Sequence, residues 1–283
     1  MRKIFPQIVE ELMKKNKKIF CLLGDIGVFS FRNIFNEHKD RILNMSTMEQ
    51  SMIGFAAGLS RAGFIPIIHS IAPFLVLRAL EQIKIDFVYN KLNCNIVSVG
   101  ASNDYSKLGS THHCFEDVSV LSNYKDINLF IPSNPIEFKY LFKKNYNNNS
   151  INYFRISENN LNFNIKTNGY LVNKNNKSLI IIVGSSINFS EIMKKNFDYY
   201  YVNTINKNIN LKFLKKYEKI FIIEPYFGNI LERRIKHLFY NKKNICTISY
   251  EETIIRKYGS KLEQDKFLNF DKIKILKRIN DYS

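Results

Sequence analysis

The chain has 283 residues, of which 45% are hydrophobic, and it carries a formal net charge of +17 at pH 7. This length can bury a sizeable core in one or two domains, and this composition excludes an intrinsically disordered protein. The positive charge suggests nucleic acid as a possible binding partner, but the lysines are scattered among asparagines and form no basic stripe. We therefore expect no nucleic-acid partner, whereas small anionic substrates are compatible with the charge.

Cysteine spacing and hydropathy bear on the compartment. The four cysteines are far apart and form no CxxC pair, which argues against a zinc site or a disulfide framework. No apolar run reaches membrane-spanning length. The N-terminal MRKIFPQIVEEL has charges within its apolar pattern, so it predicts an amphipathic helix and not a signal peptide. We expect a cytoplasmic protein in a reducing compartment, with no membrane partner and no metal ligands of its own.

Strands and helices alternate along the first half of the chain. A helix at 6–15 is followed by apolar strands, which we predict at 18–23, 41–45, 64–69, 95–100, 128–131 and 152–156. Between the strands we predict helices from 49, at 74–89 and at 136–144, and helical structure beginning at 118–121. The polar segment 101–112 is too irregular to be core. This alternation indicates a parallel α/β sheet.

The second half repeats the pattern on a smaller scale. Polar, asparagine-rich stretches at 145–150 and 157–177 are a candidate linker. Beyond them we predict strands at 179–183, 199–203, 220–224 and 245–249, and helices at 188–195, 211–216 and 230–239. The fold class is therefore α/β, with two consecutive domains that each hold a mainly parallel sheet flanked by helices.

The segment MSTMEQSMIGFAAG, residues 45–58, is the candidate for a site. Its apolar residues recur at helical spacing, so we predict a helix that opens at Glu49. Small residues at 54 and 56–58 would let another backbone or a flat ligand approach closely. A buried carboxylate needs a partner or a proton, and such a group can hand a proton to a ring nitrogen. The alternative is a charge that only complements the helix dipole.

Seven short segments resemble the C-terminal half of the transketolase family, in the family's order. They are GD at 24–25, MEQSMIGFAAGL at 48–59, FLVLRALEQI at 74–83, GSTHHCFED at 109–117, IPSNPIE at 131–137, YFRIS at 153–157 and IIEPYFGNI at 222–230. The resemblance covers most of residues 20–240. It implies a pyrimidine-binding domain for thiamine diphosphate at 1–158, followed by a transketolase C-terminal-like domain at 159–283.

The resemblance also implies which residues bind the coenzyme. Glu49 matches the glutamate that hydrogen-bonds the aminopyrimidine of thiamine diphosphate and activates the coenzyme. Phe74 matches the aromatic residue that stacks on the pyrimidine, although its alternative is ordinary core. Asp25, with an alternative as a turn residue, and Met48 and Ile71 complete the expected coenzyme contacts. The helix that follows Phe74 also carries Arg78 and Gln82, which we expect to be structural.

Two further residues are expected at the substrate. His112 matches a catalytic histidine that faces substrate and coenzyme, with His113 beside it as the rival. Arg155 matches an arginine that holds a sugar phosphate, but an arginine at a strand end is equally a salt-bridge partner. Glu116 and Asp117 are expected to begin the next helix, where negative charge is favoured.

The chain departs from the family in ways that affect assembly and substrate. It has no GDG motif with a downstream Asn, which in this family holds the diphosphate and Mg²⁺ (or Ca²⁺). The resemblance therefore implies half an enzyme, completed by an N-terminal subunit that carries this motif, in an α2β2 heterotetramer. Gly100, Leu108 and Ile71 replace family residues around the substrate, so the acceptor is expected to be a specialised sugar or sugar phosphate.

The function implied is that of a thiamine-diphosphate-dependent transferase. It would move a two-carbon ketol unit, or a related acyl unit, to an aldehyde or ketone acceptor. A carboligase like deoxyxylulose-phosphate synthase or the β-subunit of a 2-oxo acid dehydrogenase is the nearest alternative. A non-catalytic regulatory homologue is the alternative from a different class, although it would need neither Glu49 nor Phe74.

Overall fold

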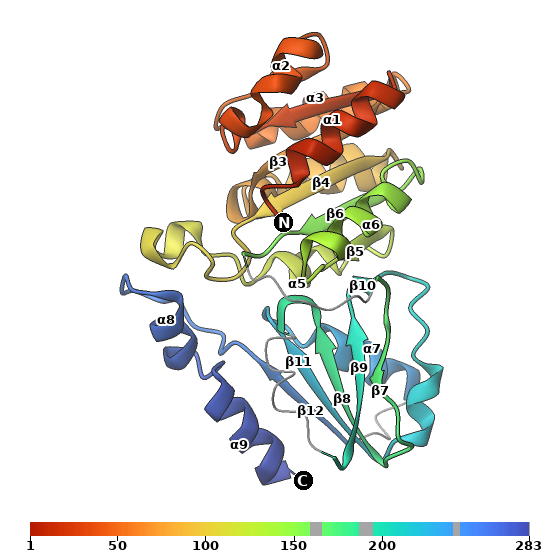
Figure 1. The fold of residues 1–283 in the computed structure, drawn as a ribbon, viewed down its shortest axis with the longest axis vertical. Coiled ribbons are helices and arrows are strands. Elements are labelled where there is room, and N and C mark those ends of the chain that lie inside the picture. The colour runs from red at the N-terminus through yellow and green to blue at the C-terminus, as the bar shows by residue number, and fades with distance from the viewer. Residues whose placement is uncertain (159–165, 187–194, 240–243, 283) are drawn as a thin grey trace.

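The computed structural model describes residues 1–282 except 159–165, 187–194 and 240–243. Two α/β units, each built on its own sheet, follow one another along the long axis of the molecule (Figure 1). Helices α8 and α9 lie along one side of the second unit, and α8 reaches the loop between β4 and α5. The α/β class and the two mainly parallel sheets predicted from the sequence are confirmed.

The first sheet has seven strands in the order β10-β5-β6-β4-β3-β1-β2, all parallel except β10. Its central strands are buried on both faces, as expected for a parallel sheet covered by helices. The seven strands of this sheet are β1 (Ile19–Leu23), β2 (Ile42–Asn44), β3 (Ile65–Ile71), β4 (Cys94–Val99), β5 (Ile127–Phe130), β6 (Ile151–Arg155) and β10 (Thr204–Ile205).

In the described part of the chain, six α-helices accompany this sheet: α1 (Phe5–Lys15), α2 (Arg32–Glu37), α3 (Glu49–Arg61), α4 (Leu80–Gln82), α5 (Asp117–Leu121) and α6 (Pro135–Asn145). The start of α6 illustrates local control, because the Asn134 side chain accepts a hydrogen bond from the Glu137 amide and Pro135 occupies the first turn. The single α-helix predicted at 74–89 is wrong in detail. Two π-helical segments, Pro73–Leu77 and Ile83–Tyr89, flank the short α4, and such π segments are often found at functional sites.

The second sheet has the order β12-β11-β8-β9-β7, with only β7 antiparallel. Its strands are β7 (Gly169–Val172), β8 (Ser178–Val183), β9 (Phe197–Val202), β11 (Lys219–Glu224) and β12 (Asn244–Ser249). The helices are α7 (Ile230–Phe239), α8 (Lys261–Phe267) and α9 (Lys272–Tyr282). Ser260 and Glu263 form a capping box that fixes the start of α8.

Several predicted segments of the second half need correction. The linker expected at 157–177 contains β7, and the helix expected at 211–216 is a 3-10 helix at Lys212–Lys216. The helix predicted at 188–195 lies almost entirely outside the described residues. Strand β10 belongs to the second half in sequence, but it pairs with β5 and so extends the first sheet.

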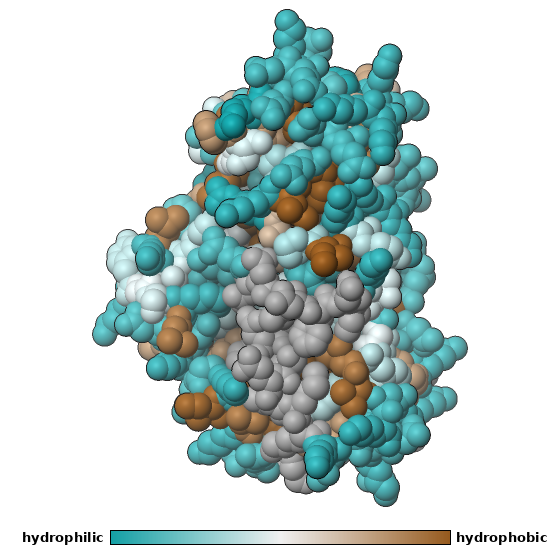
Figure 2. Space-filling view, in the orientation of Figure 1, coloured by the Kyte–Doolittle hydropathy of each residue, from teal (hydrophilic) through white to brown (hydrophobic). Residues whose placement is uncertain are grey.

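One hydrophobic core passes from the first unit into the second. Leu22 and Met52 of the first unit belong to the same buried cluster as Ile181 and Leu231 of the second. On the face seen in Figure 2 the surface is mainly hydrophilic, with separate hydrophobic patches. No helix in the described part of the chain combines the length and the apolar character needed to cross a bilayer.

Candidate active site at the edge of the first sheet

Glu49 is the first residue of α3, and its side chain is completely buried. Its Oε1 accepts a hydrogen bond of 2.9 Å from the Ser70 hydroxyl, which also lies 3.3 Å from the carbonyl oxygen of Gly24. Gly24 makes this contact possible, because a Cβ at this position would lie only 2.6 Å from Ser70 Oγ. Since β1 ends before Gly24 and Ser70 is near the end of β3, the carboxylate lies at the sheet edge where α/β proteins bind ligands.

Arg78 covers this carboxylate from the solvent side. Its Nη1 donates to Glu49 Oε2 at 2.5 Å, and its guanidinium carbon lies 4.4 Å from the centre of the Phe74 ring. The Arg78 side chain is 40% exposed and that of Glu49 is fully buried, so the pair connects the interior to the surface. Arg78, for which the sequence indicates a structural role, therefore belongs to the site. The signal available in the sequence is its position four residues after Phe74, which puts both side chains on one helical face.

His112 also lies against the Phe74 ring. The two rings are 5.2 Å apart at an interplanar angle of 72°, and the Thr111 hydroxyl lies 2.9 Å from His112 Nδ1. The neighbouring His113 is buried and does not take this position, and burial lowers the pKa of its imidazole. Of the two histidines, His112 is therefore the one that the fold brings beside Phe74.

Tyr105 fills the space beside Gly100, one of the positions that depart from the expected transketolase pattern. A Cβ at Gly100 would lie 2.6 Å from the Tyr105 ring and 3.4 Å from Ile71, and the glycine φ of +78° also disfavours other residues. The Tyr105 ring in turn lies 6.4 Å from His112. The departures at Gly100 and Ile71 thus lie close together, since a Cβ at position 100 would meet both the Tyr105 ring and Ile71.

The remaining predicted coenzyme contacts are less closely grouped. Asp25 is exposed, with a positive φ of 54°, and exchanges hydrogen bonds with Asn44: the Asp25 amide donates to Asn44 Oδ1, and Asn44 Nδ2 donates to Asp25 Oδ1. This geometry fits the turn alternative as well as a ligand contact. Met48 precedes α3 and is 53% exposed, whereas Ile71 ends β3 and is half-buried.

Arg155 is buried and forms its contacts inside the protein. Its side chain is 1% exposed, its Nε donates to Asp117 Oδ2 at 2.7 Å, and its Nη2 donates to the Ser102 hydroxyl at 2.8 Å. Nη2 also lies 3.2 Å from the carbonyl oxygen of Pro225. This geometry contradicts the predicted phosphate contact, because the guanidinium is committed to groups inside the protein. The salt-bridge alternative is the one that the structure contains, and Asp117 is its acid.

The loop that carries His112 is held by the second unit. The Ser102 hydroxyl donates to the carbonyl of Pro225, the Ser110 hydroxyl donates to that of Ile255, and Gln264 Nε2 donates to that of Ser106. The sequence predicts that segment 101–112 is too irregular to belong to the core. Several of its residues are nevertheless buried, because these contacts cover them. The second unit therefore contributes to the site by fixing the loop.

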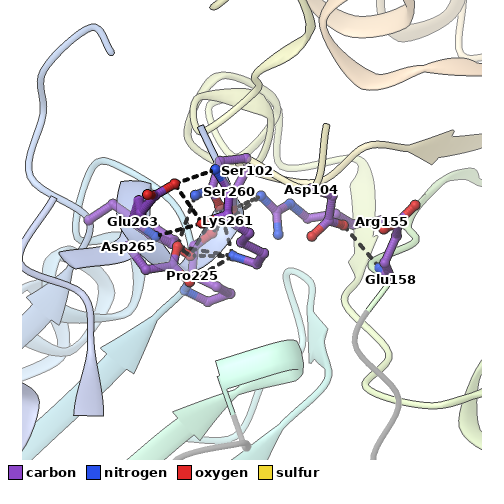
Figure 3. A network of polar contacts seen from close by, with 11 residues as sticks. Ser102, Asp104, Arg155, Glu158, Pro225, Ser260, Lys261, Glu263 and Asp265 are labelled. Atoms are coloured by element: carbon purple, nitrogen blue, oxygen red, sulfur yellow. Dashed lines mark hydrogen bonds and ion pairs between the residues drawn. The ribbon is translucent and has the colours of Figure 1, made fainter. Parts of the chain in front are cut away.

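Lys261 is the centre of this junction (Figure 3). Its Nζ donates to Asn103 Oδ1 at 2.8 Å, to the Tyr250 hydroxyl at 3.0 Å and to Asp265 Oδ1 at 3.1 Å. Burial alone would lower the pKa of this ammonium, but Tyr250 and Asp265 raise it above its ordinary value. Across a small polar cavity of about 60 Å³, burial raises the pKa of the Asp104 carboxyl. A charged lysine thus connects the loop to α8.

Among the described residues, no group of three or more His, Cys, Asp or Glu side chains could hold a metal ion. The four cysteines are free, and burial raises the pKa of each thiol. These residues offer no alternative chemistry to that of the Glu49 site.

Comparison with solved structures defines the class of protein. The chain superimposes on a structure described as "Split gene transketolase, inactive beta4 tetramer" with a TM-score of 0.83 and 17% identity, covering 99% of this chain and 97% of that one. At this identity the likeness establishes the fold. The class is that of proteins with the transketolase fold.

Sequence comparison gives the family. Residues 1–164 match the family described as "Transketolase, pyrimidine binding domain", so the chain belongs to the transketolase family, as the motifs predicted. It is 40% identical over 101 residues to a subunit of the apulose-4-phosphate transketolase of Actinobacillus succinogenes, covering 36% of this chain and 32% of the relative. It is 27% identical over 143 residues to "6-deoxy-6-sulfo-D-fructose transketolase subunit SqwH" of Clostridium sp. (strain MSTE9), covering 50% and 44%. The matched part thus spans less than half of each relative.

Proposed function

We propose that this chain is the C-terminal subunit of a two-component transketolase-like enzyme. With thiamine diphosphate, the assembled enzyme would transfer a two-carbon ketol unit, or a related acyl unit, to an aldehyde or ketone acceptor. One observation carries the proposal: a fully buried carboxylate, Glu49, lies next to an aromatic ring, Phe74, with one flat cationic group in contact with both.

That flat group, the Arg78 guanidinium, indicates what the site is shaped to bind. It is planar, it carries N–H donors, it donates to Glu49 Oε2, and it lies over the Phe74 ring. An aminopyrimidine ring is also planar and could form the same two contacts. Because Arg78 is long and 40% exposed, its side chain can move toward solvent when a coenzyme ring enters.

When bound, thiamine diphosphate would supply the carbanion chemistry, and this chain would supply position and protons. Glu49 would hydrogen-bond a pyrimidine nitrogen and hold it in a space shielded from water. Phe74 would set the plane of the ring, with Met48, Ile71 and Asp25 around it. His112, which contacts Phe74, would hold or move a proton at the substrate. Arg155 has no part in this arrangement except through the loop that it anchors.

The site meets solvent at the 40% exposed Arg78, and exposed apolar residues on neighbouring elements support a partner subunit. Large apolar side chains are exposed just before α3, on α3 and on the π-helical segments, namely Met48, Phe55, Leu77, Ile85 and Tyr89. A set of exposed apolar residues on adjacent elements is typical of a protein interface. The partner would be an N-terminal subunit with the GDG motif that binds the diphosphate and Mg²⁺ or Ca²⁺, and the proposed assembly is α2β2. Both relatives are named as transketolase subunits, which supports this division.

Substitution of Glu49 in the assembled pair tests the proposal. The tagged chain is purified from its native cells with its partner, and thiamine-diphosphate-dependent consumption of ketose donors is followed by product mass. We expect Glu49→Ala to abolish turnover and Glu49→Gln to reduce it by about 100-fold or more, as for loss of a positioned acid–base group. The matched control is Glu37→Gln, which removes an exposed carboxylate from α2. Near wild-type turnover of Glu49→Ala at saturating coenzyme would refute the proposal.

A further inference from the structure

A second, basic groove lies at the junction of the two units. It has a volume of about 580 Å³, within the range of small-molecule sites. Its walls come from three segments, namely residues 122–125 after α5, residues 207–211 after β10, and one face of α7. None of the residues that define the Glu49 site lines this groove, so it is a separate feature of the surface.

Cations converge on this groove without acids among its described lining residues. Lys125, Lys207, Arg233 and Arg234 line it, with His237 at the same wall. Burial lowers the pKa of the Arg234 guanidinium, and among the smaller causes Tyr226 raises it and the charge of Arg233 lowers it. Lys207 has an acidic neighbour outside the lining, Asp126, whose carboxylate lies 3.7 Å from Lys207 Nζ in a pair that is 62% exposed on both sides. An exposed pair of this kind neutralises little of the local field.

The lining residues of α7 follow the helical repeat. Positions 230, 233, 234, 237 and 238 are spaced i, i+3, i+4, i+7 and i+8, so they form one face of the helix. Arg234 is fixed in this face, because its Nη1 donates to the carbonyl of Asn206 at 2.8 Å. Cations are therefore presented from a rigid helix on one wall and from a loop on the other.

The floor of the groove is apolar. Ile209, Leu211, Ile230 and Leu238 contribute to its lining, and Leu211 and Ile230 also belong to the buried core. A ligand that fits must therefore combine anionic groups with a body that packs on aliphatic side chains. Inorganic anions alone would use the cations and leave the floor without a contact.

We propose that this groove binds a small phosphorylated ring compound, of the class of nucleotides and sugar phosphates, at a site distinct from the proposed coenzyme site. The phosphates would lie between the arginines of α7 and Lys207, where several cations share the anionic charge. The ring body would pack on Ile209 and Leu238. This inference does not depend on the proposed transketolase activity, because it rests on residues outside that site.

Calorimetry on the full chain tests the inference with two probes, ADP and inorganic pyrophosphate. The groove variant is Lys207→Gln/Arg233→Gln, which removes two cations of the groove and leaves the Arg234 contact intact. The control variant is Lys17→Gln/Lys39→Gln, which removes the same charge from exposed positions of the first unit. We expect ADP to bind wild type more tightly than pyrophosphate does, and the groove variant to weaken ADP binding by about tenfold or more. The control should stay within about twofold of wild type, as expected for distant charges screened by salt.

Three results would overturn the inference. They are no detectable ADP binding, equal weakening in the groove and control variants, and pyrophosphate binding as tight as ADP binding. Equal weakening would assign the effect to the diffuse net charge of +17. Because these readouts measure binding alone, a failure here leaves the Glu49 test unaffected, and a failure of the Glu49 test leaves this one intact.

Discussion

Glu49 is a buried carboxylate with two stabilising neighbours, a cation and a hydrogen-bond donor. A buried carboxylate is stabilised by a cation or by hydrogen-bond donors. In this structure Arg78 supplies the cation and Ser70 supplies a hydroxyl. Ser70 lies on the sheet and is itself buried, but Arg78 is exposed and can leave. A ligand with a ring nitrogen therefore competes with Arg78 and not with Ser70.

This competition predicts the effect of replacing Arg78. Arg78→Met keeps a long side chain on the helix but cannot donate to Glu49. We expect the assembled enzyme with Arg78→Met to bind thiamine diphosphate a few-fold more tightly, because no guanidinium has to be displaced from the carboxylate. Titration calorimetry of the coenzyme measures this. Substitution of the neighbouring exposed Leu77 by Met is the control, and a large loss of coenzyme affinity confined to Arg78→Met would contradict the competition.

His69 is buried in the same strand as Ser70, and it gives a pH dependence. Burial lowers the pKa of its imidazole to about 4, while Nδ1 lies 2.8 Å from the carbonyl oxygen of Val97. The unfolded chain takes up this proton near pH 6.5 and the folded chain near pH 4. The contribution of neutral His69 to the free energy of unfolding is therefore complete above pH 6.5. It falls by about 3 kcal/mol as the pH drops from 6.5 toward 4.

Urea unfolding of wild type and His69→Phe at about pH 7 and about pH 4.5 measures this effect. These two pH values span most of the range in which His69 is expected to lower the stability. Phe keeps a ring beside Phe5, whose centroid lies 4.8 Å from that of His69, but it does not titrate. We expect the free energy of unfolding of the variant to fall less between these pH values. Equal falls in both proteins would assign the acid sensitivity to other groups.

At the scale of elements, the link between α8 and the His112 loop is specific. Lys261 opens α8, and its hydrogen bond to Asn103 joins this helix to the start of the loop. Asp265, one turn later in α8, accepts from Asn103 Nδ2 at 2.9 Å as well as from Lys261. Loss of the lysine would leave Asp265 without its cation, which is costly for a half-buried acid.

We therefore expect Lys261→Met to loosen the loop. Backbone amides of residues 102–112 should exchange with deuterium faster, by about tenfold, since a hydrogen-bonded charge contributes about 1.5–3 kcal/mol. Lys277→Met in α9 is the matched control, as Lys277 is exposed. Unchanged exchange in the loop of Lys261→Met would mean that the hydroxyl contacts of Ser102 and Ser110 suffice to hold it.

The elements that the sequence predicts well are those whose pattern is local. Strand β3 is an unbroken apolar run, and α3 has apolar residues at helical spacing, so the predictions place both within a residue or two. Strand β7 escapes prediction because it is half-buried at the sheet edge, and the two-residue β10 is too short to carry a pattern. The burial of segment 101–112 depends on residues more than 100 positions away, which no local pattern can indicate.

The same distinction holds for the site. The placement of Glu49 and Phe74 follows from one helix start and one motif. The role of Arg155 depends on Asp117 and Ser102, whose approach is decided by the packing of β6 against the loop. The sequence alone allows an arginine at a strand end to bind a phosphate or to form a salt bridge with an acid. The salt bridge with Asp117 becomes visible only in the tertiary structure.

At the scale of the whole molecule, the proposed function divides the coenzyme site between this chain and a partner subunit. In that proposal Glu49 and Phe74 would hold the pyrimidine end, and among the described residues no group of His, Cys, Asp and Glu side chains could hold a metal ion. Met48, just before α3, and Phe55, within α3, are large apolar side chains that are exposed in this chain. Burying such residues against a partner is favourable by about 25 cal/mol per Å² of apolar surface.

We predict that the isolated chain binds thiamine diphosphate weakly and without dependence on Mg²⁺, and that the co-purified pair binds it tightly only with the metal. A contact limited to one ring leaves the diphosphate in solvent, whereas the complete site adds charge-assisted contacts to both phosphates. Calorimetry of the chain and of the pair, each with Mg²⁺ and with EDTA, measures this. Tight, magnesium-dependent binding by the chain alone would contradict the division of the site.

The surface through which the pair forms is tested by Phe55→Asp, which places a charge on the proposed interface and away from the Glu49 carboxylate. Phe55 is 44% exposed on α3, so the fold tolerates the change, but a charge there would have to be desolvated on pairing. We expect Phe55→Asp to abolish co-purification of the partner. Glu37→Gln on α2 is the control and should pair normally, since only the face formed by α3 and the π-helical segments is expected to meet the partner. Normal pairing of Phe55→Asp would move the interface to another face of the chain.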